Sequence, residues 1–254
     1  MNKERGIIRP VVFLTPLELV LIEKILLRIG TKITRMKMRI VFLLCCLAGL
    51  RLREISELQL SDFVREPKTG LLARDEKNRA VLRLPTNKGK YHVGSHPQFV
   101  LVLVPHLADA IDCYLKSDAM AGAPANAYLI HKGNRWSCGR INPRSITVFF
   151  QRYKSILSAG LVHHPKGTIF SLYDLRHTCH DLIIIYAQGR YNISQIIARI
   201  HLRQQLGYSY SSLKFGCPIT RTEYYDAVLY TLGFPWDERE IKMWIKEREQ
   251  QQSL

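Results

Sequence analysis

Paired cysteines at metal-ligand spacing are absent from this 254-residue sequence. None of its cysteines belongs to a Cys-x-x-Cys pair, which excludes the usual zinc frameworks and gives no sign of a disulfide scaffold. The adjacent histidines His163 and His164 have no cysteine or acidic partner at ligand spacing, which argues against a metal site. We therefore expect reduced, buried thiols, no metal and no other cofactor. The cysteines are Cys45, Cys46, Cys113, Cys138, Cys179 and Cys217.

Long apolar runs are also missing. The longest one, Ile40–Ala48, is too short to cross a bilayer. The charged N-terminus lacks the apolar core of a signal peptide. These absences argue against a membrane-spanning or exported protein and predict a cytoplasmic one.

Acidic residues are scarce relative to basic ones. The chain has 37 Lys and Arg against 21 Asp and Glu, a formal net charge of +16 with a pI of about 9.8. Its apolar content of 47% is that of a folded globular protein. Such an excess of positive charge indicates a polyanionic partner, most simply nucleic acid. A membrane surface is the alternative, but no basic amphipathic helix supports it.

The pattern of apolar residues predicts a mainly α protein with a small antiparallel β-sheet at one edge. Thr15, Pro16 and Glu18 form a strong helix start, and Gly30 follows the end of that helix. The second predicted helix is apolar almost all round and should lie in the middle of the core. Expected helices cover residues 16–28, 35–48, 52–63, 107–115, 142–157, 174–188, 193–206 and 237–250, and expected strands cover 71–72, 80–84 and 99–104.

The segment Ser171–Thr178 is the central candidate for a functional site. Ser171, followed three residues later by Asp174, is typical of a capped helix start. Arg176 then lies in the first turns, where backbone N–H groups and the helix dipole favour an anion. A guanidinium at this place can hold a phosphate through two hydrogen bonds. The alternative is an ordinary helix start with a solvated arginine.

Arg51 is the second candidate. It follows Gly49 and lies between the apolar helix and the next, amphipathic one. The alternative interpretation is an arginine in a linker, paired with Asp62.

These two segments resemble sequence boxes of the tyrosine recombinase (phage integrase) family. Residues 173–178, Tyr-Asp-Leu-Arg-His-Thr, resemble its His-x-x-Arg-His box, with Tyr173 where histidine is expected. Residues 48–55 resemble its first arginine box, in which Glu54 matches a glutamate that supports the active-site arginines. The resemblance implies a divergent, minimal member of the family, with His177 and Glu54 supporting the catalytic groups.

Three further residues complete the resemblance. Lys88, in residues 86–90, matches the lysine of the family's hairpin turn, and Lys90 is the alternative. Tyr208 occupies the position of a second expected histidine after Leu206-Gly207, although His201 can serve instead. In the Thr-x-x-Tyr box at 222–225, Tyr225 matches the nucleophile better than Tyr224.

The resemblance also implies a domain plan: an N-terminal arm (1–13), a catalytic domain (14–232) and a C-terminal helical tail (233–254) that can dock in trans. The expected activity is site-specific recombination or integration of double-stranded DNA by a homotetramer. Either the protein is a minimal recombinase that lacks the family's DNA-clamping domain, or accessory DNA-binding proteins take the place of that domain. Such an integrase belongs to a mobile genetic element. A type IB topoisomerase-like enzyme and a catalytically inactive DNA-binding relative are the alternatives.

The implied chemistry uses only side chains. Arg51 and Arg176 neutralise the phosphate, Tyr225 attacks it to give a 3′-phosphotyrosyl bond, and Lys88 protonates the leaving 5′ oxygen. A tyrosine is a poor general base near neutral pH, so Tyr173 and Tyr208 are expected to donate hydrogen bonds to phosphate oxygens.

Overall fold

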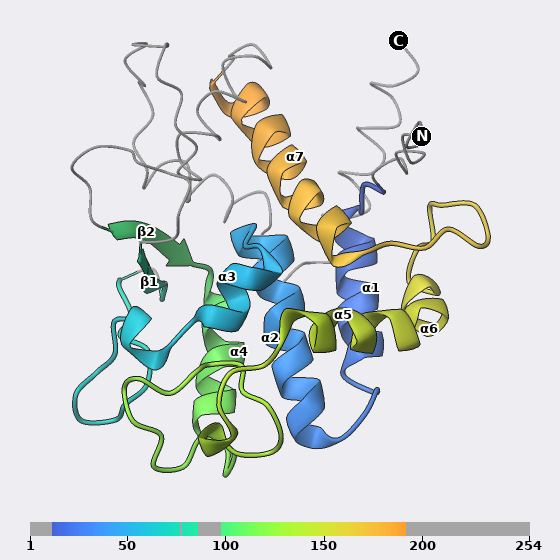
Figure 1. Cartoon of the computed structure of the whole chain (residues 1–254). Helices are drawn as coiled ribbons and strands as arrows, with labels where there is room; N and C mark the ends of the chain where they lie inside the picture. The colour runs from blue at the N-terminus through green and yellow to red at the C-terminus, as the bar shows by residue number, and fades with distance from the viewer. Residues whose placement is uncertain (1–11, 77, 86–97, 192–254) are drawn as a thin grey trace, which may run out of the picture.

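Residues 12–76, 78–85 and 98–191 are described by the computed structural model of the chain (Figure 1). Within these residues the fold is mainly helical, with one two-stranded antiparallel sheet at the edge of the helices. The predicted fold class is therefore confirmed. In chain order the elements are α1 (Pro16–Leu26), α2 (Lys32–Ala48), α3 (Leu52–Glu57), η1 (Leu60–Asp62), β1 (Ala80–Pro85), β2 (Gln98–Leu103), α4 (Pro105–Leu115), η2 (Trp136–Cys138), α5 (Pro143–Arg152), α6 (Lys154–Ser158) and α7 (Leu172–Tyr191).

Helix α2 forms the centre of the core, and α1, α3, α4 and α7 all pack against it. Every residue from Ile40 to Ala48 is buried, as its apolar sequence predicts. The helix ends at Gly49, whose left-handed φ of +62° lets the amides of Gly49 and Leu50 both donate to the carbonyl of Leu44. This turn reverses the chain and delivers Arg51 to the start of α3.

The N-terminal capping prediction is confirmed in α1. The Thr15 hydroxyl accepts a hydrogen bond from the Glu18 amide, and the Glu18 carboxylate accepts one from the Thr15 amide at 2.8 Å. The sheet pairs β1 with β2 in antiparallel register, with Ala80 opposite Leu103. No helix of the described residues is both long and apolar enough to span a membrane.

The prediction of one helix over 52–63 is wrong. Helix α3 ends at Glu57, and Leu58 adopts an extended conformation with ψ of 129°. The Leu58 carbonyl accepts a hydrogen bond from Leu129 at 2.8 Å, and the Leu60 amide donates to Ala127 at 2.9 Å. Backbone pairing with a segment distant in sequence therefore outweighs the local helical pattern.

The expected strand at 71–72 is also absent from the named sheet. Leu72 makes only an isolated bridge with Arg65, and its amide donates to the Asp112 carboxylate at 2.9 Å. The Glu66 amide donates to Leu71 and the Ala73 amide to Val64, so backbone pairing occurs here but is limited to one bridge.

Several predicted helix ends differ from the structure by two or three residues, and two predicted helices differ in a further way. The helix expected over 142–157 divides into α5 and α6 at Tyr153, whose ψ of 11° interrupts it while its ring packs on Phe149. Helix α7 continues through Gly189 to Tyr191, although Gly189 was the predicted end. One added hydrogen bond per residue outweighs the cost of glycine, about 1 kcal/mol. The helices predicted over 193–206 and 237–250 lie outside the described residues.

Candidate active site

The start of α7 is held by the capping contacts that its sequence predicts. The Ser171 amide donates to the Asp174 carboxylate at 2.6 Å, and the Ser171 hydroxyl does so at 2.9 Å. The Asp174 amide donates in turn to the Ser171 hydroxyl oxygen at 3.4 Å. Asp174 is buried, so these bonds fix the direction of the helix that carries Arg176.

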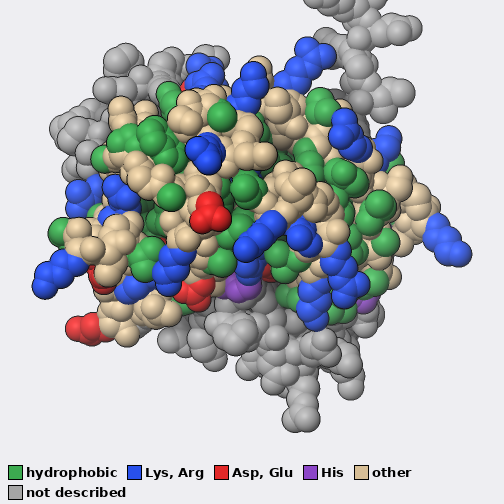
Figure 2. Space-filling model, turned by 90° about the horizontal axis from the view of Figure 1, so that it is seen from below, with side chains coloured by type: hydrophobic (Ala, Val, Ile, Leu, Met, Phe, Trp, Pro, Cys, Tyr) green, Lys and Arg blue, Asp and Glu red, His purple; other side chains and the backbone are tan. Residues whose placement is uncertain are grey.

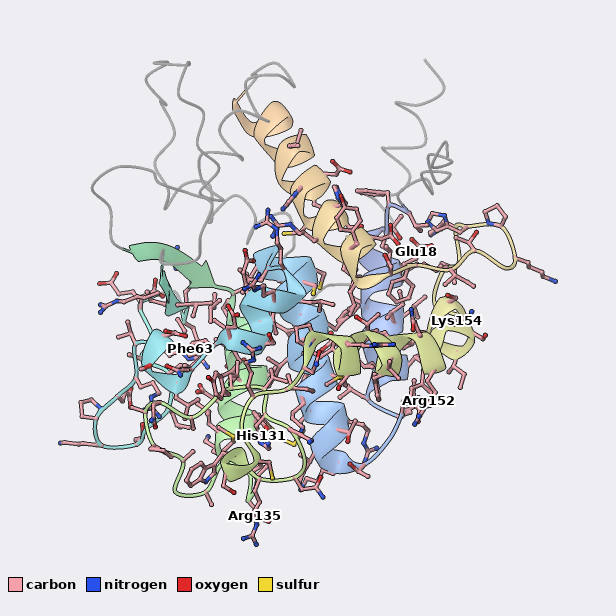
Figure 3. The ribbon with its side chains drawn as sticks, viewed as in Figure 1. Glu18, Phe63, His131, Arg135, Arg152 and Lys154 are labelled. Carbon is pink, nitrogen blue, oxygen red and sulfur yellow. The ribbon has the colours of Figure 1, made fainter. Side chains whose placement is uncertain are left out.

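The segment before α1 also donates hydrogen bonds to this end of α7. The Val12 amide donates to the second oxygen of Asp174 at 3.1 Å, and the Leu14 amide donates to the Thr178 hydroxyl at 3.0 Å. Nearby, His164 contacts the Phe13 carbonyl at 2.8 Å, while the His163 amide donates to Glu18 at 2.9 Å. Figure 3 shows Glu18 on α1 close to the start of α7. The His164 ring and the His163 backbone thus hold the loop before α7 to the start of α1.

Arg176 is buried, unlike the solvated arginine of the alternative interpretation. Its side chain is 8% exposed, and its Nη1 donates a hydrogen bond to the carbonyl oxygen of Gly49. The same nitrogen lies 3.8 Å from Oε2 of Glu54. The guanidinium therefore joins α7 to the turn between α2 and α3.

Arg51 meets the same carboxylate from the other side. Its Nη1 lies 2.9 Å from Oε1 of Glu54, and its backbone amide donates to Oε2 at 2.6 Å. The Arg51 side chain is 38% exposed, so it borders solvent while Arg176 lies behind it. The alternative partner, Asp62, accepts a hydrogen bond from the Gln59 amide at 2.7 Å. The structure thus brings Arg51, Glu54 and Arg176 together.

Tyr173 and His177 lie side by side on α7. Tyr173 is 63% exposed, and its ring meets the edge of the His177 ring at a centroid distance of 4.2 Å. The ring of His180 follows, 5.9 Å from that of His177. Their spacing places three aromatic rings along the side of α7 that also carries Arg176.

Sequence reasoning missed His180. Its Nε2 is buried and has no hydrogen-bond partner among the described residues. Burial, together with the charges of Arg176, His177 and Arg51, lowers the pKa of His180 to about 3. The ring is therefore neutral at neutral pH. The available signal was its place one turn after Arg176 on the same helix.

Buried thiols surround this junction. Cys45, Cys46 and Cys179 are free and buried, as expected, but Cys113 and Cys138 are exposed, so the expectation of buried thiols is wrong for these two. Burial raises the pKa of Cys179 to about 12, against the opposing charge of Arg176. Within the described residues, no group of three His, Cys, Asp or Glu side chains could hold a metal ion.

The other predicted site residues lie outside the described residues. These are Lys88 and its alternative Lys90, Tyr208 and its alternative His201, and the nucleophile Tyr225 with its alternative Tyr224. Their roles stay predictions.

A second feature missed by the sequence analysis is a long segment without carboxylates. No acidic residue occurs between Asp118 and Asp174. Figure 2 shows many Lys and Arg side chains and few acidic ones on the lower face, and Figure 3 shows Arg135, Arg152 and Lys154 at the outside of the molecule. The Lys and Arg side chains of this acid-free segment are all exposed: Lys132, Arg135, Arg140, Arg144, Arg152, Lys154 and Lys166.

Comparison with known proteins relates this fold to recombinases. No family model matches the sequence, and no curated protein matches it. The structure of XerH site-specific recombinase bound to its difH substrate, in a pre-cleavage complex, is 17% identical, with a TM-score of 0.50 over 90% of this chain.

The alignment with XerA recombinase has 14% identity and a TM-score of 0.49, and it covers 98% of this chain and 67% of the XerA chain. The alignment with the integrase of mycobacterium phage Brujita has 13% identity and a TM-score of 0.40, and it covers 89% of this chain and 65% of the integrase chain. This chain spans about half the length of the XerH chain, 53%. At such identities a likeness establishes the fold alone, so this chain has a fold similar to that of XerH.

Proposed function

We propose that this protein is a site-specific DNA recombinase or integrase that cleaves and rejoins DNA through a 3′-phosphotyrosyl intermediate. The observation that carries the proposal is the arrangement of Arg51 and Arg176 around Glu54. Two guanidinium groups held by one carboxylate form a compact, positively charged site. The site belongs to a fold similar to that of XerH. A phosphodiester is the anion for which such a pair is suited.

The arginines have separate tasks in this mechanism. A guanidinium carries five N–H donors in a rigid fork, so Arg176 can hold the Gly49 carbonyl with one edge and face a phosphate with another. Arg51, which borders solvent, meets the other non-bridging oxygen. As charge builds on the pentavalent phosphate, both guanidinium groups stabilise it.

The bond changes balance without a cofactor. The hydroxyl oxygen of Tyr225 attacks the phosphorus and transfers its proton to a water molecule, forming a phosphotyrosyl bond to the 3′ side of the break. The bond from phosphorus to the 5′ oxygen breaks, and Lys88 gives a proton to that oxygen. Attack by a 5′ hydroxyl reverses these steps and rejoins the strand, so no external energy source is required.

Tyr173 replaces a basic histidine with a weaker base. Because it is exposed beside His177, we propose that its hydroxyl donates a hydrogen bond to the phosphate, and that Tyr208 does the same. Proton transfer from the nucleophile then depends on other groups, and cleavage should be slow.

The partner that we propose is double-stranded DNA. The net charge of +16 and the exposed cations of the acid-free segment favour a polyanion. By analogy with the family resemblance, we further propose a homotetramer on DNA, aided by accessory DNA-binding proteins, acting in the cytoplasm. The domain plan remains part of this proposal: an arm (1–13), a catalytic domain (14–232) and a tail (233–254) that docks in trans.

One observation favours a second candidate, a DNA-binding relative without catalysis: tyrosine stands at 173 and 208 where the family has histidine. A type IB topoisomerase-like enzyme would share the chemistry. Covalent trapping separates the inert candidate from the others. The protein is incubated with nicked duplexes that cover the DNA flanking its own gene, and complexes resistant to SDS are measured.

We expect a covalent complex that is lost in Tyr225→Phe and retained in Tyr224→Phe. A strand-exchange assay then separates the recombinase from a topoisomerase. DNA binding at low salt without any covalent complex would contradict the proposed activity and support the inert relative.

A further inference from the structure

His180 lies where α7 meets the turn between α2 and α3. It follows Arg176 by one helical turn, and both residues approach Gly49. Arg176 binds the Gly49 carbonyl oxygen, while the imidazole of His180 lies against the Gly49 α-carbon. Two successive turns of α7 thus contact Gly49, which lies two positions before Arg51.

The space for this imidazole depends on glycine at position 49. A Cβ added there would lie 3.3 Å from Nε2 of His180, 3.4 Å from its Cδ2 and 3.5 Å from the sulfur of Cys179. Contacts of 3.0–3.4 Å are tighter than ordinary van der Waals packing, so a side chain at 49 would require the imidazole to shift by a few tenths of an ångström. The left-handed φ of +62° favours glycine there as well.

The imidazole is also in an environment that keeps it neutral. Burial lowers its pKa most, and the charges of Arg176 and His177 on α7 and of Arg51 on the turn add to that effect. Its Nε2 is buried without a hydrogen-bond partner among the described residues, which is a cost that an apolar side chain would avoid. Neither charge nor hydrogen bonding therefore explains why an imidazole, instead of an apolar side chain, occupies this junction.

We propose that His180 is a positioning residue, whose neutral imidazole sets the spacing between α7 and the Gly49 turn and so aligns Arg176 with Arg51 around Glu54. This inference rests on the proposed function. The ring does not touch the phosphate; it acts through the two arginines. A shorter side chain would let the turn move towards α7, and a cation would repel both guanidinium groups.

The alignment matters because catalysis by bound groups is sensitive to small displacements. A misplacement of about 1 Å can lower a rate by about 100-fold. Loss of the His180 ring should therefore slow the chemical step more than it weakens DNA binding, since it leaves the exposed Lys and Arg side chains of the acid-free segment unchanged.

The test compares His180→Ala and His180→Gln with His163→Ala, a control at an exposed histidine. Single-turnover formation of the covalent complex is measured at saturating nicked duplex, and the DNA Kd is measured separately. We expect His180→Ala to lower the rate by about 100-fold with a Kd within about twofold, and His180→Gln, which fills the space with an uncharged amide, to recover most of the rate. Cleavage by His180→Ala at the rate of the unmodified chain would overturn the inference.

A second readout does not depend on cleavage. Hydrogen exchange of the Arg176 guanidinium, followed by NMR, reports its bond to Gly49 directly. We expect faster exchange in His180→Ala and unchanged exchange in His163→Ala. If the unmodified chain forms no covalent complex, the proposed function fails, and this exchange rate alone decides the inference: equal rates in the unmodified chain and His180→Ala would overturn it.

Discussion

Arg51 and Arg176 contact the two oxygens of a single carboxylate, that of Glu54, at 2.9 and 3.8 Å. One arginine starts α3 and the other lies in the first turns of α7, so this carboxylate joins two distant segments of the chain. Because Glu54 also accepts the Arg51 amide at 2.6 Å, its position is fixed by the backbone. The pair of guanidinium groups is thereby preorganised before any anion binds, which is the condition for electrostatic catalysis.

Glu54→Gln should separate the two arginines. The amide can still cap α3, but it no longer balances two positive charges, so the guanidinium groups should repel each other and lose alignment. We predict a single-turnover cleavage rate lower by about 10- to 100-fold, with DNA affinity equal or higher. The matched control is Glu57→Gln, on the same helix, whose carboxylate contacts Arg53 and Arg140. Equal rates for the two variants would contradict this role of Glu54.

The acid-free segment should contribute to DNA binding in a salt-dependent way. Arg152 and Lys154 are exposed at the junction of α5 and α6. If both contact phosphates, replacing them with alanine should reduce the slope of log K against log salt by about 0.9 per lost contact. Titration of a labelled duplex at several salt concentrations measures the slope. Lys24 and Lys68, exposed outside the segment, provide the control pair, for which we expect a smaller change.

The charge of His180 should make the stability of the fold depend on pH. Its pKa is about 3 in the folded chain, against an ordinary value of 6.5, because burial and Arg176 disfavour the charged ring. Between pH 6.5 and pH 3 the unfolded chain therefore binds more protons, and the free energy of unfolding falls as the pH falls.

We predict that His180→Gln flattens this decline, by an amount on the order of 1–3 kcal/mol over the window. Urea unfolding at a series of pH values measures it, with His163→Gln as the control. Parallel curves for the unmodified chain and His180→Gln would show that the ring does not titrate as described.

Lys37 should stabilise the loop after residue 130. Its ammonium donates to the carbonyls of His131 at 3.0 Å and of Gly133 at 2.5 Å, and burial lowers its pKa to about 8. Lys37→Met leaves both carbonyls without this donor. We predict a loss of about 1–3 kcal/mol in the free energy of unfolding, measured by urea denaturation. For Lys32→Met, exposed on the same helix, we expect a change within about 0.5 kcal/mol.

Local signals predicted the parts of the site that are set by local chemistry. The capping of α7 by Ser171 and Asp174 and the glycine turn before Arg51 follow from short-range hydrogen bonding and backbone preference, which a sequence displays directly. Glu54 was expected only from the resemblance to the family's first arginine box, although its bond to a backbone amide three residues away is also a local contact. The mainly α fold with a small sheet follows from the apolar periodicity in the same way.

Contacts between distant segments set the rest. The break after Glu57 depends on backbone pairing of Leu58 and Leu60 with residues 127–129, and no local pattern encodes such pairing. The burial of Arg176 depends on its bond to Gly49, and the role of His180 depends on the space beside the same glycine. The contacts of Arg176 and His180 with Gly49 form only when α7 packs against α2.

The most direct test of the account is to identify the amino acid that becomes joined to DNA. Covalent complexes trapped on nicked duplexes are digested with nuclease and trypsin, and the peptides are sequenced by mass spectrometry. We predict a nucleotide attached to Tyr225, within the tryptic peptide 222–239. A nucleotide on Tyr224, on a serine or on any other residue would contradict the assigned nucleophile, and a trapped complex without a modified tyrosine would contradict the phosphotyrosyl mechanism.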